Sequence, residues 1–171
     1  MSAVHDGMVR ILAELDGKSL ADAFAELVEH RINMRGTADE YFASLLRLPS
    51  PLLELYAPLI FNSHVCMDGL ADTIPLYDTN DFMTALRDGC EMLDQSALFS
   101  IIDRAREHLR NPGSTALMSD APNVALDRET GNIHSTYFAN NKQLMIQIAQ
   151  YLQVHRDRVL IAASELDGLH G

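Results

Sequence analysis

Residues 50–75 read SPLLELYAPLIFNSHVCMDGLADTIP, and the first half of this stretch is almost entirely apolar. Its opening Ser-Pro pair is typical of a helix start, because proline at the first helical position gives up an N–H that has no helical partner there. A helix that is apolar all round lies at the centre of a protein, so we expect a central helix over residues 52–74. Pro58 should kink or break this helix, and Pro75 should end or distort it.

Helical patterns continue on both sides of this stretch, with apolar residues recurring every three or four positions. These stripes lie in residues 8–15, 20–28, 41–48, 82–93, 98–109 and 144–159. Thr37-Ala38-Asp39-Glu40 reads as a capping box, in which the side chains of the first and last residues bond each other's backbone N–H. No segment alternates convincingly as a strand does, and the nearest candidate is the short stretch 123–126. The sequence therefore predicts an all-α protein.

Length and composition indicate one domain. A chain of 171 residues suits a single domain with its own core, and 47% hydrophobic with 22% charged residues is ordinary for a globular protein. We expect one compact all-helical domain over residues 1–171, with about six to eight helices. Residues 112–133 carry Pro, Gly, Ser, Thr, Asn and Asp without a period, and are predicted to form one long loop.

The compartment is predicted from what the sequence does not show. No apolar run approaches the roughly 18 residues of a membrane span, and the polar start MSAVHDGMVR does not resemble a secretory signal. The two cysteines, Cys66 and Cys90, have no clustered partners and are predicted to be buried, reduced core thiols. We therefore expect a cytoplasmic protein that does not bind membranes.

The net charge of −11 is concentrated in residues 54–94, where eight acids stand against Arg87 alone. Such a charge disfavours direct binding to nucleic acid or to an anionic membrane, both of which attract Lys and Arg. Asp88 and Glu91 are neighbours on one predicted helix face, and their repulsion costs about 0.2–0.5 kcal/mol. Because the sequence retains this unfavourable pair, we expect the charge to be displayed to a basic partner. A merely solvated helix face is the alternative.

The candidate partner-binding residues are therefore Asp68, Asp72, Asp78, Asp81, Asp88, Glu91 and Asp94. The loop predicted over residues 112–133 is a further candidate for partner contacts.

Motifs for catalysis, cofactors or metals are absent from the sequence. His64 and Cys66 lack a third ligand at helical spacing, and a histidine in an apolar helix is more often a core residue. No Gly-rich phosphate loop, GxSxG or Ser-x-x-Lys motif occurs. We therefore expect a protein that is not an enzyme and that has neither cofactor nor metal. A pocket lined by His64, carboxylates and tyrosines would favour an enzyme instead.

Two parts of the chain carry a resemblance to a known family. Residues 66–74, CMDGLADTI, follow the apolar helix, and Leu126-Asp127, Tyr137-Phe138 and Tyr151-Leu152 come later in that order. Over residues 45–160 the chain thereby resembles the DNA-mimic protein family of small, acidic, all-helical bacterial proteins. In that family an apolar helix leads into a Val-x-Asn-Gly-Gly-Phe-x-Gln-Phe-Phe motif. Gly69 matches one glycine of this motif, whereas its Asn, its second Gly and its Gln are replaced.

The resemblance implies an all-helical fold, dimerisation, and a negative surface that occupies the nucleic-acid site of a DNA-binding regulator. Related sequences also suggest immunity proteins, which neutralise a toxin or secreted effector by covering it. In both cases an acidic surface steers onto a basic one and blocks it. We therefore expect a non-enzymatic inhibitory binding protein whose partner has a basic surface. The alternative is a structural or adaptor protein that acts through homodimerisation, with incidental charge.

Overall fold

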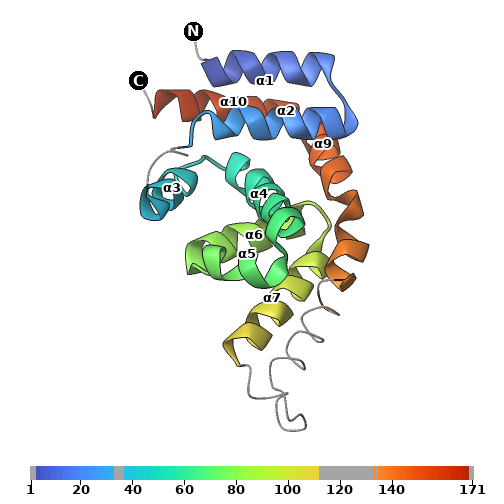
Figure 1. Cartoon of the computed structure of the whole chain (residues 1–171). Coiled ribbons are helices and arrows are strands. Elements are labelled where there is room, and N and C mark those ends of the chain that lie inside the picture. Colours follow the sequence, from blue (N-terminus) through green and yellow to red (C-terminus); the bar gives the residue numbers. More distant parts are fainter. Residues whose placement is uncertain (1–2, 33–36, 112–132, 134, 170–171) are drawn as a thin grey trace, which may run out of the picture.

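The computed structural model describes residues 3–32, 37–111, 133 and 135–169, and these residues form one all-α domain (Figure 1). The helices are α1 (Ala3–Glu14), α2 (Gly17–Glu29), α3 (Ala38–Leu45), α4 (Leu52–Asp68), α5 (Leu70–Tyr77), α6 (Asn80–Met92), α7 (Ser96–Arg110), α9 (Leu144–Val154) and α10 (Arg156–Gly168). A short 3-10 helix, η2 (Asn141–Gln143), precedes α9, and residues 135–140 are also helical. The described residues contain no strand, which confirms the all-α prediction.

Helix α4 lies between two groups of helices (Figure 1). On one side α1 packs against α2 and α10, which places the two ends of the described chain close together. On the other side α6 packs on α4, and α7 contacts both α5 and α6. Helix α9 runs along the edge and joins the two groups. The central position of α4 confirms the interpretation of its apolar sequence, since residues from every side of this helix are buried: Leu52, Leu55, Tyr56, Ala57, Leu59, Ile60, Phe61 and Val65.

The described part of the chain has more helices than the six to eight that the sequence predicted, because two expected helices are divided. Gly69 separates α4 from α5 with a φ of 86°, a conformation that glycine adopts at little cost. Pro58 and Pro75 both lie inside helices, so the break falls at Gly69 and not at a proline. The final helix is divided at His155, whose φ of −106° and ψ of 31° are not helical.

Two sequence predictions about local structure have different outcomes. The capping box is confirmed at the start of α3, where the Thr37 N–H donates to the Glu40 carboxylate at 2.7 Å and the Glu40 N–H donates to the Thr37 hydroxyl at 3.3 Å. The loop predicted over residues 112–133, with the strand candidate 123–126 inside it, lies outside the described residues except for Ile133, which is helical and buried.

The contact between α4 and α6 depends on a proline and a glycine. Because Pro58 has no N–H, the carbonyl of Glu54 one turn earlier receives no helical hydrogen bond from position 58. Gly89 of α6 lies directly against this carbonyl, and a Cβ atom at Gly89 would overlap the Glu54 oxygen. The glycine therefore allows α6 to approach the backbone of α4 at the point where a carbonyl is left free.

We expect Gly89→Ala to lower the free energy of unfolding by about 2 kcal/mol, because overpacking a core contact costs about 1–3 kcal/mol and the obstructing atom belongs to the backbone. Gly168→Ala is the matched control, since a Cβ there meets no atom within 4 Å. The control should leave stability unchanged or raise it by up to about 1 kcal/mol. Urea denaturation followed by circular dichroism measures both, and equal midpoints would contradict the close approach.

Candidate partner-binding surface

Helix α6 exposes an acidic face. Its apolar residues are buried, whereas Asp81 and Glu91 are exposed and the Asp88 side chain is 46% exposed. At 100° per residue, positions 81, 88 and 91 fall on the same side of the helix, and the sequence analysis had placed Asp88 and Glu91 on one face. Asp94 follows Leu93, the C-cap residue of this helix, and is also exposed. We call Asp81, Asp88, Glu91 and Asp94 the α6 acidic face.

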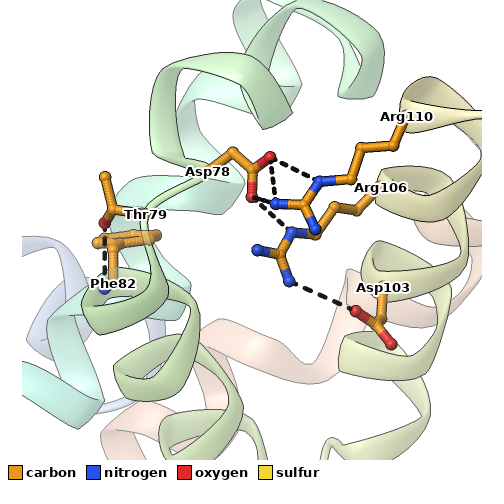
Figure 2. Close-up of polar contacts among 6 residues, drawn as sticks. All are labelled: Asp78, Thr79, Phe82, Asp103, Arg106 and Arg110. Atoms are coloured by element: carbon orange, nitrogen blue, oxygen red, sulfur yellow. Dashed lines mark hydrogen bonds and ion pairs between the residues drawn. The ribbon is translucent and has the colours of Figure 1, made fainter.

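Local interactions hold the start of this helix and neutralise part of its charge. The Thr79 hydroxyl accepts a hydrogen bond from the Phe82 N–H at 3.3 Å and caps the N-terminus (Figure 2). Asp81 lies in the first turn, where a carboxylate is favoured by the helix dipole. Arg87 donates to Asp88 from two nitrogens at 2.9 and 3.0 Å. Asp81, Glu91 and Asp94 therefore carry most of the uncompensated charge of this face.

Asp78 is engaged within the chain. Its carboxylate accepts hydrogen bonds from Arg106 and Arg110 of α7, at 2.9–3.1 Å for Arg110, and only 23% of its side chain is exposed (Figure 2). Burial raises the pKa of Asp78, but the two guanidinium groups lower it by more, so that the net shift is downward. Asp78 thus ties the end of α5 to α7, and its charge is already matched by bases about 30 residues away in the sequence.

Asp68 and Asp72 stand on either side of Gly69, where α4 meets α5. Both side chains are exposed. They belong to other helices than the α6 acidic face, so the seven predicted residues do not form one stripe. The structure groups four of them on and after α6, places two at the α4–α5 junction, and pairs Asp78 internally.

Asp94 ends α6 in a left-handed conformation with a φ of 55°. The Gln95 N–H donates to the Cys90 carbonyl at 2.6 Å, and the Asp94 N–H donates to the Glu91 carbonyl at 3.1 Å. These are the two bonds of a Schellman cap, whose left-handed position is usually glycine. A carboxylate at a helix C-terminus also opposes the helix dipole. Glycine would be favoured here by both effects, although aspartate adopts the left-handed conformation more readily than most residues.

Asp94 lines a hollow of about 220 Å³ between the end of α6 and α9. The rings of Tyr151 and His155, 4.3 Å apart, form part of its wall, and Val154 beside them is 75% exposed. Gln147 also lines it, and its amide oxygen is buried without a hydrogen-bond partner among the described residues. We call this hollow, defined by Asp94, Gln147, Tyr151, Val154 and His155, the α6–α9 pocket. The sequence analysis missed it, because its walls come from helices far apart along the chain.

A second hollow of about 530 Å³ lies between α2 and α4. Asp22, Glu26 and Glu29 line it from α2, and Cys66 lines it from α4. Cys66 is exposed, so the prediction of two buried thiols is wrong for this residue, because the last turn of α4 extends beyond the core that surrounds its first turns. The prediction is correct for Cys90, whose burial raises its pKa to about 12 and keeps the thiol protonated.

A cluster of tyrosines and His64 lies in the core near α4. The Tyr56 hydroxyl donates to Glu29 at 3.3 Å, and the His64 ring packs edge-on against Tyr77 at 5.4 Å. Burial raises the pKa of Tyr41, Tyr56 and Tyr77, so these hydroxyls stay protonated. Glu29 reaches the α2–α4 hollow, whereas the tyrosines and His64 do not line it. We therefore interpret the cluster as core packing.

The described residues contain no group of three or more His, Cys, Asp or Glu side chains that could hold a metal ion. Among the helices of the described ranges, none is both long and apolar enough to cross a membrane. No family model, curated protein or solved structure matches this chain. The α6 acidic face and the pocket at its end are thus interpreted from their own geometry.

We expect Asp78→Asn to lower the free energy of unfolding at pH 7 by about 1–2 kcal/mol, because charged hydrogen bonds between α5 and α7 are lost. The pKa of Asp78 is depressed in the folded chain, so its stabilisation is complete above the unfolded pKa of about 4 and is lost as the pH falls through the folded value. The gap between wild type and variant should therefore shrink at acid pH in urea titrations. The exposed Asp68→Asn is the control, with an expected change within about 0.5 kcal/mol; a gap independent of pH would contradict the pairing.

We expect Asp94→Gly to raise the free energy of unfolding by about 0.5–1 kcal/mol, since glycine relieves both the left-handed backbone and the repulsion from the helix end. Asp94→Ala, which removes the charge but keeps a Cβ in that conformation, should be less stable than Asp94→Gly. Thermal and urea unfolding of the three proteins measure this order. A destabilised Asp94→Gly would show that the aspartate serves the fold.

Proposed function

We propose that this protein is a non-catalytic inhibitor that blocks a basic protein partner through the α6 acidic face. The observation that carries the proposal is that Asp81, Asp88 and Glu91 project from one side of a single helix, with Arg87 the one base on that helix. Asp88 is paired with Arg87, but Asp81 and Glu91 form no ion pair among the described residues, and the face as a whole attracts a basic surface over a long range.

The packing of α6 supports the proposal. The helix is seated on α4 through Gly89, is capped by Thr79, and contacts α7. Its carboxylates are therefore presented on a rigid element, and binding costs little ordering of the backbone. A preformed acidic surface of this kind gives fast and selective association with a basic partner.

Two classes of partner fit this chemistry. A carboxylate and a phosphate both offer anionic oxygens to Arg and Lys, so an acidic helix can occupy the nucleic-acid site of a DNA-binding regulator. The same surface can cover the basic site of a toxin, as an immunity protein does. The resemblance to DNA-mimic proteins supports both, and the proposal places the protein in the cytoplasm, without direct binding to nucleic acid.

Homodimerisation is the second proposal, because several large apolar side chains are exposed. Met67, Val154 and Ile161, on α4, α9 and α10, are 62–75% exposed. A dimer built on such residues would be held by an apolar interface and would persist at high salt. Sedimentation equilibrium at low and high salt separates this adaptor proposal from a monomeric inhibitor.

We expect a variant with Asp81, Asp88 and Glu91 all changed to Lys to keep the helical circular dichroism of the wild type but to associate about 10- to 1000-fold more slowly with its partner. The partner is first captured by wild-type protein from a lysate of the native host at low salt and released at high salt. Association rates are then measured by surface plasmon resonance over a range of salt concentrations. The variant should retain only a weak salt dependence.

The matched control changes three exposed acids on other helices, Glu14, Glu107 and Glu165, to Lys. It alters the net charge by the same amount and should slow association much less. If the α6 variant associated as fast as wild type at low salt, the acidic face would not be the binding surface. If both variants slowed association equally, net charge rather than α6 would be responsible.

A further inference from the structure

We infer that α1 and α10 form a latch that opens as one unit while the helices around α4 stay folded. The inference goes beyond the proposed function and does not depend on it. The two helices lie side by side (Figure 1), and α10 makes its main contacts with α1. They run antiparallel, because Asp167 near the end of α10 bonds the start of α1, whereas Gln153 near the end of α9 bonds the end of α1. We call this pair of helices the α1–α10 latch.

The start of α1 is capped from the other end of the latch. The Asp167 carboxylate accepts hydrogen bonds from the Val4 N–H at 3.0 and 3.2 Å and from the His5 N–H at 3.0 Å. N–H groups in the first turn of a helix have no partner within it, and a capping side chain directly before the helix usually supplies the acceptor. Here the acceptor is 162–163 residues away in the sequence. The cap therefore exists only while α10 is docked on α1.

Asp167 is placed for α1 and against its own helix. It lies in the last turn of α10, where a carboxylate opposes the helix dipole and where no basic residue stands. At the start of α1 the same charge is favoured. Arg31, which follows α2, donates to this carboxylate at 3.0 Å, and only 9% of the Asp167 side chain is exposed. A carboxylate buried to this extent needs its donors, so its charge favours the closed latch over a detached α10.

The end of α1 is also capped by the C-terminal helices. The Gln153 side-chain amide donates to the carbonyls of Leu12 at 3.3 Å and of Leu15 at 3.1 Å, and the last turn of α1 has no basic residue. The last carbonyls of a helix, like its first N–H groups, lack partners within the helix. An isolated helix as short as α1, with its 12 residues, is marginal in water. When α1 leaves α10 it loses its caps and its apolar cover together, so we expect the latch to open cooperatively.

The other helices keep their main contacts when the latch opens. Helix α6 packs on α4, α7 packs on α5 and α6, and α2 packs on α4 and α9. These contacts involve neither α1 nor α10. Opening of one such unit costs less free energy than global unfolding. The open form exposes the apolar side of α1, whose residues are at most 8% exposed in the closed form: Val4, Met8, Ile11 and Leu12. The latch therefore controls access to apolar surface that the closed protein hides.

Native-state hydrogen exchange followed by nuclear magnetic resonance tests whether the latch opens separately. In the wild type, amides of α1 and α10 should exchange at one common rate, about 100-fold faster than the slowest amides of α4 and α6. Gly89→Ala weakens the α4–α6 contact, which persists when the latch opens. It should speed the slowest amides of α4 and α6 about 30-fold and leave those of the latch unchanged. If Gly89→Ala sped all of these amides equally, α1 would open only by global unfolding and the inference would be overturned.

Variants of Asp167 test what holds the latch closed. Asp167→Ala should speed exchange at the Met8 and Leu12 amides about 10- to 100-fold, because it removes the cap of α1 and leaves Arg31 without its partner. Asp167→Asn, whose amide oxygen can still cap, should speed it less. Glu165→Ala removes an exposed carboxylate from the same end of α10 and should change these rates by no more than about twofold.

Unchanged exchange in Asp167→Ala would overturn the role of the cap and with it the latch. Should Asp167→Ala not fold, the comparison of wild type with Gly89→Ala decides the question, because neither protein alters the latch.

Discussion

The contact between the Glu54 carbonyl and Gly89 sets how closely α6 sits on α4, and the candidate surface depends on it. Pro58 has no N–H, so this carbonyl does not accept the hydrogen bond that it would accept in a regular helix. Gly89 has no side chain to obstruct the approach of α6. With its apolar side pressed onto the central helix, α6 must turn its acidic side to solvent. The direction of the charge is thus a consequence of core packing.

Some of the acidic residues in 54–94 form ion pairs within the chain and others do not. Asp78 is matched by Arg106 and Arg110, so its charge stabilises the junction of α5 with α7. Asp88 is paired with its neighbour Arg87. The unpaired charge of this segment is therefore smaller than its net charge suggests, because ion pairs within the chain neutralise part of it.

Asp94 departs from the rules that the rest of α6 follows. Its left-handed backbone and its carboxylate at the helix end both cost stability, and the residue also lines the α6–α9 pocket. The fold therefore places a small pocket next to the end of a stiff acidic helix.

The sequence alone determined the features that depend on short-range interactions. Helix periodicity, the Thr37 cap and the all-round apolar character of α4 were predictable, since each involves residues within a few positions of one another. Only the tertiary structure decided that Gly69 and not a proline divides the central segment, and that Cys66 lies outside the core. It likewise decided which acids are paired and that α6 and α9 form a pocket, because these depend on how distant helices pack, and no local pattern of residues encodes that packing.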